Sequence, residues 1–161
     1  MRTVALLERL LDRILSVVTV ALTVAMVALV VAAVVMRYVF GAPLIYSYDL
    51  STLIFAWIVF VGLAVAEHDR AHLAVDAIDG LASPRARAGL VVVRQVGMAA
   101  LSLFVAVIGW SLFSRAGMIM PSLRVSIGWL YASLPIGFAL LALAQLLAIP
   151  RIVRAGSGER P

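Results

Sequence analysis

Four long runs without a charged residue dominate the pattern of hydrophobic and polar positions along the chain. They cover residues 14–36, 50–66, 95–114 and 125–150, and are 23, 17, 20 and 26 residues long. A helix needs roughly 20 apolar residues to cross a bilayer, with a range of about 17–25. Such near-continuous apolarity is not typical of amphipathic helices in water. We therefore expect an all-α membrane protein with one membrane domain, 1–161. Its four transmembrane helices should cover about residues 14–38, 47–66, 92–114 and 125–149.

Composition agrees with lipid as the main solvent. Hydrophobic residues make up 65% of the chain and the mean hydropathy is +1.13, whereas soluble domains are about 45–50% apolar. The absence of cysteine excludes disulfides, thiolate catalysis and thiolate metal sites. The net charge of +5 lies between the apolar runs, so we expect contact with membrane lipid and no nucleic acid partner.

The distribution of arginine predicts the orientation. All 13 basic residues are arginine, and ten of them lie in the N-terminal segment, the connection 67–94 and the C-terminal tail. The positive-inside rule places these ten, and both termini, in the cytoplasm. Aromatic residues gather near the opposite interface as in an aromatic belt; they are Tyr38, Phe40, Tyr46, Tyr48, Trp110, Trp129 and Tyr131.

Two amphipathic stretches adjoin the spans. Residues 6–14 and 69–81 alternate apolar and polar positions at helical spacing. They predict short interfacial helices at the N-terminus and between the second and third spans. The pattern leaves open whether these helices rest on lipid or hold a second subunit.

The connection 37–49 is predicted to be a short outer hairpin. Gly41 and Pro43 fit a turn. Ser47 is a plausible N-cap of the second span, and Asp49 in its first turn suits the helix dipole. Arg37 and Asp49 either pair across the hairpin or simply mark where lipid ends.

The chain offers little chemistry of its own. His68 and His72 are four residues apart, so they would share a helix face near Glu67 and Asp76. A metal site is one interpretation, but no further histidine exists to complete it, which favours a solvated pair. Serines within the spans have no histidine or lysine at membrane depth to act as a base. We expect no enzyme, no catalytic residue, no metal and no other cofactor.

Several residues within the spans are instead predicted to serve packing. Serines and glycines should close contacts between helices; they are Ser102, Ser111, Ser126, Ser133, Gly97, Gly109 and Gly137. Trp57 should face protein, because its indole N–H needs an acceptor in lipid. Pro135 should bend the fourth span, and Gln145 should hydrogen-bond to a neighbouring helix.

No ionisable side chain lies near the middle of any span. Cation-coupled carriers usually place ionisable groups or broken helices at the bilayer midplane. The helices are therefore interpreted as packing elements that need a partner subunit. The alternatives are a stand-alone four-helix small carrier or a membrane assembly protein. A carrier would need an embedded carboxylate, for which only Asp49 at the membrane edge is near.

Two segments resemble the small permease subunit of tripartite ATP-independent periplasmic (TRAP) transporters, the DctQ-like family. The first comprises Arg37–Gly41, Pro43–Leu44, Tyr46–Leu50 and Phe55–Gly62, and the second Leu123–Tyr131 followed by Leu134–Gly137. His72 with Val75-Asp76 also matches a histidine of the family. The family's tryptophan in the outer hairpin is Tyr46 here, its two acidic positions are Tyr48 and Asp49, and a usual proline is replaced by Ser126–Gly128.

This resemblance implies a scaffold subunit of a cation-coupled symport system for uptake, in the bacterial inner membrane. Its partners would be a large multi-spanning permease subunit, which carries the substrate and sodium sites, and a periplasmic substrate-binding protein that delivers an organic acid. The candidate interface residues on this reading are Arg37, Tyr38, Asp49, Trp57, His72, Arg124, Trp129, Tyr131 and Pro135.

Overall fold

A computed structural model describes residues 2–76 and 84–156, with side chains placed for residues 9–67, 89 and 92–149. These residues form four helices: α1 (Arg2–Tyr38), α2 (Ser47–Asp76), α3 (Pro84–Ser114) and α4 (Gly128–Gly156). Each holds a stretch long and apolar enough to cross a membrane, namely Arg9–Tyr38, Ser47–Glu67, Val92–Ser114 and Gly128–Ile149. The predicted all-α fold with four membrane-spanning helices is confirmed.

The two short interfacial helices are not confirmed as separate elements. Residues 6–14 are part of α1, which is one continuous helix of 37 residues, and residues 69–76 continue α2. The reason is visible in α1, where Leu11 and Leu15 extend one packed face from the predicted interfacial stretch into the span. Residues 77–81 of the second stretch lie outside the described residues.

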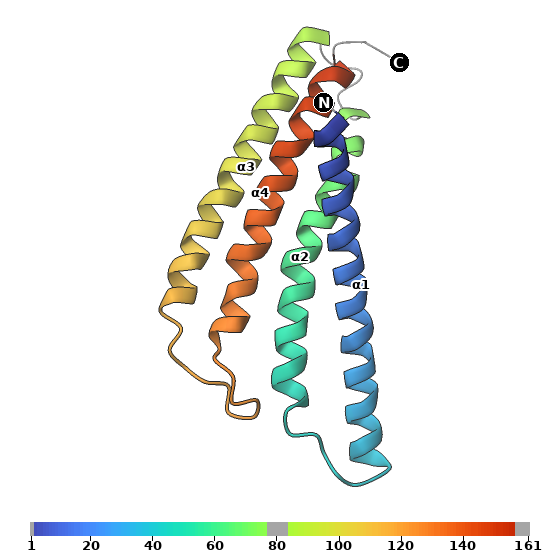
Figure 1. The fold of residues 1–161 in the computed structure, drawn as a ribbon, viewed down its shortest axis with the longest axis vertical. Coiled ribbons are helices and arrows are strands. Elements are labelled where there is room, and N and C mark those ends of the chain that lie inside the picture. The colour runs from blue at the N-terminus through green and yellow to red at the C-terminus, as the bar shows by residue number, and fades with distance from the viewer. Residues whose placement is uncertain (1, 77–83, 157–161) are drawn as a thin grey trace.

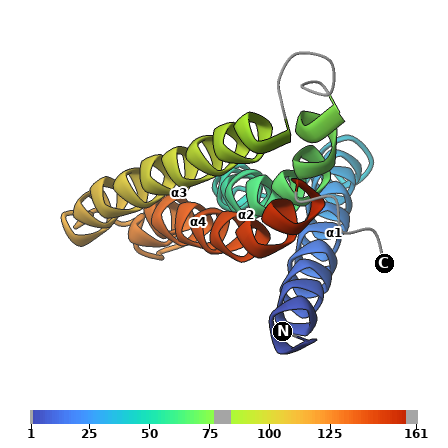
Figure 2. The ribbon, with the colours of Figure 1, turned by 90° about the horizontal axis from the view of Figure 1, so that it is seen from above.

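The helices form an open row in the order α1–α2–α4–α3 (Figures 1 and 2). The last helix of the chain, α4, packs on α3 at one side and on α2 at the other, and α1 packs on α2. The burial follows this order: 44% of the most apolar stretch of α4 is buried within the chain, and 0% of that of α1. Most of the apolar surface of this row therefore faces outward.

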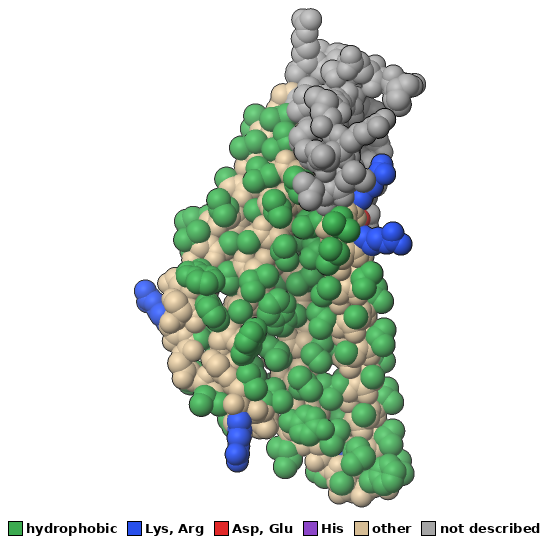
Figure 3. Space-filling model, viewed as in Figure 1, with side chains coloured by type: hydrophobic (Ala, Val, Ile, Leu, Met, Phe, Trp, Pro, Cys, Tyr) green, Lys and Arg blue, Asp and Glu red, His purple; other side chains and the backbone are tan. Residues whose placement is uncertain are grey.

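The start of α1 and the end of α4 lie at the same end of the row, and the connections 39–46 and 115–127 lie at the other (Figure 1). We call this second end the outer end, following the predicted orientation. Hydrophobic side chains cover most of the face drawn in Figure 3, and the few arginines visible lie at its periphery. This distribution suits helices that cross a lipid bilayer side by side.

A small core lies where α1, α2 and α4 meet. Its buried members are Leu15, Val61, Ala64 and Leu141. Trp57, Phe138 and other partly buried residues pack around them. This core joins α1 to the row through the first half of its span and leaves the outer end of α1 less tightly held.

Candidate functional site

The seam between α3 and α4 is built from a stripe of small and polar residues. Gln95, Ala99, Ser102, Ala106 and Gly109 are all buried, at alternating spacings of four and three residues. This spacing places one face of a helix along a neighbour at a small crossing angle. Small residues let the two backbones approach closely, which is the usual source of helix association in membranes. The sequence analysis named Ser102 and Gly109 as packing residues but did not recognise the stripe to which they belong, although its spacing is visible in the sequence.

Two glycines mark close approaches of α4 to its neighbours. A Cβ atom on Gly109 of α3 would overlap the side chain of Leu134 and lie 3.1 Å from Cδ of Pro135. A Cβ atom on Gly137 of α4 would lie 2.5 Å from the backbone oxygen of Phe60 in α2. The predicted packing roles of both glycines are confirmed. That of Gly97 is wrong, because it is exposed and a Cβ there would meet nothing within 4 Å.

The predicted serine contacts are only partly right. Ser102 of α3 donates to the side-chain oxygen of Gln145 in α4 at 3.1 Å, which confirms both residues as links between helices. Ser133 is buried, but its hydroxyl donates to Leu130 of its own helix. Ser111 and Ser126 are exposed, and Ser126 instead accepts the backbone N–H of Gly128 at the start of α4.

Trp57 joins α2 to the start of α4. Its indole N–H donates to the backbone oxygen of Trp129 at 3.2 Å, which confirms that it faces protein. The side chain of Trp129 is itself 59% exposed and that of Tyr131 is 38% exposed. Both aromatic rings are therefore available to lipid or to another subunit at the outer end.

A polar cluster lies farther from the outer end, where α2, α3 and α4 meet. The Gln95 amide nitrogen donates to Glu67 Oε1 at 3.4 Å and to the backbone oxygen of Gln145 at 3.3 Å. Gln95 and Gln145 are 1% and 0% exposed, and Gln95 Oε1 and Gln145 Nε2 have no partner in the structure. The hydrogen bonds of Gln95 thus join three helices. The side-chain amide of Gln145 accepts a hydrogen bond from Ser102 but donates none.

Replacing these two glutamines by methionine should have unequal effects. Gln145→Met removes an unpartnered donor and lets Ser102 bond to its own helix, so we expect the free energy of unfolding to change by less than about 1 kcal/mol. Gln95→Met also removes an unpartnered atom, Oε1, but it breaks the bonds to Glu67 in α2 and Gln145 in α4, so it should lower the free energy of unfolding by about 1–3 kcal/mol. Thermal unfolding of both variants in one detergent measures the difference. A larger loss for Gln145→Met would contradict the assignment.

The outer end is held together by Asp49 in the first turn of α2. Its Oδ2 atom accepts the backbone N–H of Ser122 at 3.3 Å and also the Ser122 hydroxyl. Asp49 therefore ties α2 to the connection between α3 and α4. The ion pair considered between Arg37 and Asp49 is not formed among the described residues, because this carboxylate is directed to Ser122.

That connection folds into a small hairpin, Met118–Ile127, which the sequence analysis did not predict. Ile127 N–H donates to Met118 and Met120 N–H donates to Val125, at 2.9 and 2.8 Å, around a bridge between Ile119 and Ser126. α4 consequently begins at Gly128 rather than at residue 125 as predicted. Arg124 at the tip has a φ of +54°, a conformation that costs a residue with a side chain about 1–2 kcal/mol.

The structure brings some predicted interface residues together. Asp49 contacts the hairpin that carries Arg124, Trp57 contacts Trp129, and Pro135 lies against Gly109. Arg37 and Tyr38 are the last two residues of α1 and lie at the outer end of the row, as Asp49, Arg124 and Trp129 do. His72 lies in α2 beyond its span, and its side chain and that of His68 fall outside the described residues. Where side chains are described, no group of acidic or histidine residues could hold a metal ion.

Most of the described fold matches one protein family. Residues 26–155, which extend from α1 to the last turns of α4, match the family of DctQ components of tripartite ATP-independent periplasmic transporters. The chain belongs to this family. No curated protein was found to match it. As a DctQ component it is the small subunit of a TRAP transporter, and the resemblance inferred from the outer hairpin and the Leu123–Gly137 segment is confirmed.

Proposed function

We propose that the chain is the membrane scaffold of a cation-coupled TRAP symporter that takes up an organic acid. It would lie in the bacterial inner membrane with both termini in the cytoplasm. A large permease subunit would carry the substrate and cation sites, and a periplasmic binding protein would deliver the substrate. The family match over residues 26–155 carries this proposal.

The open row of helices supports a scaffold role. Helix α4 is covered by α2 on one side and by α3 on the other. By contrast, 0% of the most apolar stretch of α1 is buried within the chain. The spans described also contain no charged side chain between Ile14 and Met36, or between Gln95 and Ser114. A polar substrate and its coupling ion would therefore be bound by another chain, while this one offers apolar surface to it.

Co-expression with the large permease subunit and the binding protein of the same system tests the proposal. The chain should co-purify with the large subunit in mild detergent. Proteoliposomes with both membrane subunits, supplied with the binding protein, should take up the organic acid when a cation gradient is imposed. Proteoliposomes without the chain should show only background uptake. Uptake that is unchanged without the chain, or a chain that never co-purifies, would refute the scaffold role.

Arg124→Gly separates a structural role of Arg124 from a role in assembly. Glycine adopts positive φ without strain, so the isolated chain should gain up to about 1 kcal/mol in unfolding free energy. If the exposed guanidinium contacts a partner, the variant should bind the large subunit or the binding protein about tenfold more weakly. Thermal unfolding and pull-down affinity measure the two effects. Unchanged affinity would remove Arg124 from the candidate interface.

A further inference from the structure

A groove of about 440 Å³ lies between the outer ends of α1 and α2. It exists because α1 is held to α2 nearer the inner end, at Leu15 and at Thr19 beside Gly62, while the connection 39–46 separates the two helices at the outer end. The lining comes from three parts of the chain. Val30, Ala33 and Val34 of α1 form an apolar wall, and Pro43 and Leu44 of the connection close the outer end. Polar groups come from Arg37, Tyr38, Ser47, Tyr48 and Ser51, which we call the polar rim.

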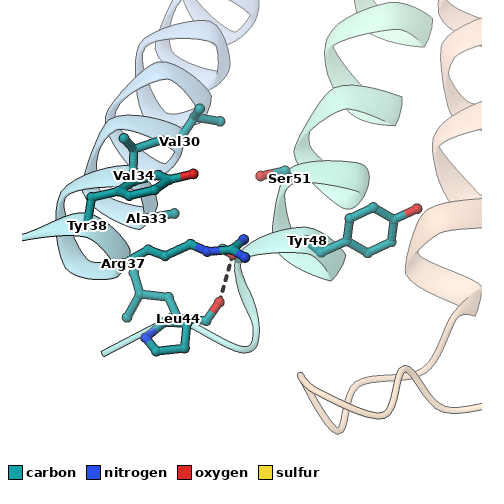
Figure 4. A pocket seen from close by; sticks show the side chains of 10 residues that line it. Val30, Ala33, Val34, Arg37, Tyr38, Leu44, Tyr48 and Ser51 are labelled. Atoms are coloured by element: carbon teal, nitrogen blue, oxygen red, sulfur yellow. Dashed lines mark hydrogen bonds between the residues drawn. The ribbon is translucent and has the colours of Figure 1, made fainter. Parts of the chain in front are cut away.

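Arg37 dominates the rim. Its side chain extends from the last turn of α1 across the groove toward the start of α2 (Figure 4). Its guanidinium carbon lies 6.0 Å from the centroid of the Tyr38 ring. The acidic residue of the α2 first turn, Asp49, is directed to Ser122. The guanidinium therefore faces the groove without a carboxylate partner among the described residues.

The surroundings favour an anion as this partner. The charged side chains described at the outer end are Asp49 and three arginines, Arg37, Arg115 and Arg124. The hydroxyl groups of Tyr38 and Ser51 point into the groove beside Arg37 (Figure 4). Arginine and hydroxyl donors together suit the oxygens of a phosphate group, because the planar guanidinium can donate two parallel hydrogen bonds.

We propose that the groove binds a membrane phospholipid, with its phosphate on Arg37 and one acyl chain along Val30, Ala33 and Val34. At 1.5 Å per residue these wall positions lie about 5–10 Å deeper along α1 than Arg37. This places the Arg37 guanidinium at the level of the lipid headgroups and the apolar wall at the level of the acyl chains. A water-soluble protein partner would reach the rim but not this wall. The inference rests on the placement of α1 and α2 in a membrane, not on the proposed transporter partners.

Lipid retention by the purified full chain tests the site. Native mass spectrometry should show phospholipid retained by the wild type. After delipidation, titration with phosphatidylglycerol should raise the thermal unfolding temperature. Arg37→Gln should weaken lipid binding about tenfold, since a charge-assisted hydrogen bond is lost. Arg115→Gln is the matched control, because Arg115 is exposed at the same end but does not line the groove, and it should bind as the wild type does.

A second variant tests the apolar wall separately. Ala33→Phe fills the groove one turn deeper on the same face of α1, keeps the charge of Arg37, and should also weaken phosphatidylglycerol binding. Glycerol 3-phosphate, which has the headgroup chemistry but no acyl chains, should bind at least about tenfold more weakly than the lipid. Equal binding of glycerol 3-phosphate, or an unaffected Ala33→Phe variant, would show a free phosphate site instead.

Two further results would overturn the proposal. Wild-type retention by Arg37→Gln, or equal binding of uncharged diacylglycerol, would show that the guanidinium is not the anchor. Unchanged lipid retention combined with weaker capture of the binding protein would identify Arg37 as a protein contact. Weaker retention in both the Arg37 and Ala33 variants, with Arg115→Gln unaffected, supports the lipid site.

Discussion

Gly137→Ala should lower the free energy of unfolding by about 2–3 kcal/mol, near the upper end of what overpacking costs. The added Cβ would lie 2.5 Å from both the Cβ and the backbone oxygen of Phe60, so α2 and α4 must move apart. Backbone atoms cannot rotate away as a flexible side chain can. The gain of about 1 kcal/mol that alanine brings as a helix former is too small to offset this loss.

Thermal or denaturant unfolding in a single detergent measures the effect. Gly97→Ala is the matched control, because it makes the same change in a membrane helix where a Cβ meets nothing within 4 Å. That variant should be neutral or slightly more stable than the wild type. Equal stability of the two variants would mean that α2 and α4 do not approach each other as closely as the structure shows.

Asp49→Ala should release the Met118–Ile127 hairpin and cost about 1–3 kcal/mol in unfolding free energy. The carboxylate accepts two hydrogen bonds from Ser122 and also occupies the first turn of α2, where the helix dipole favours negative charge. Hydrogen exchange of the Met118–Ile127 hairpin should accelerate in this variant. Asp49→Asn keeps an acceptor oxygen but loses the charge, so its effect should be smaller.

A double-mutant cycle with Ser122→Ala isolates the contact. Residues in direct hydrogen-bond contact show coupling energies of about 0.5–3 kcal/mol. A coupling near zero would mean that Asp49 acts only through its own helix. Thr52 provides a local control, since its hydroxyl bonds within α2 and its removal should leave the hairpin protected.

The membrane-spanning helices could be predicted from the sequence because each depends on local composition. The run from Ile14 to Met36 has no charged residue, and Gly41 and Pro43 interrupt helix formation after it. Such signals are contained within a few residues. The start of α4 was predicted three residues too early because residues 125–127 carry no charge, whereas in the structure Val125 and Ile127 pair with Met120 and Met118.

The order of the row could not be predicted in the same way. It depends on which faces of α3 and α4 match, and this match is made by residues with weak individual signals, such as Ala99 and Ala106. Gly97 illustrates the difficulty, since it has the same composition signal as Gly109 but lies on the opposite, exposed side. Only the alternating spacing of the buried stripe distinguishes the two glycines.

The partner of Asp49 was missed for a related reason. Arg37 is the nearest opposite charge in the sequence, whereas Ser122 lies 73 residues away and is uncharged. Turn formation at the tip of the hairpin places the Ser122 N–H toward α2, which no pattern of hydrophobic positions indicates. The deep polar cluster was partly predicted because an amide in a span needs a partner, but its link to Glu67 depends on the same tertiary arrangement.

The central place of α4 has a consequence for how the protein is made. Of the four helices, the ribosome makes α4 after the others, so α1, α2 and α3 are synthesised before the element that joins α3 to the other two exists. Until then the buried face of α3, including Gln95 and Ser102, has only lipid or the insertion machinery as a neighbour. The row can therefore close only after α4 has been made and packs on both α2 and α3.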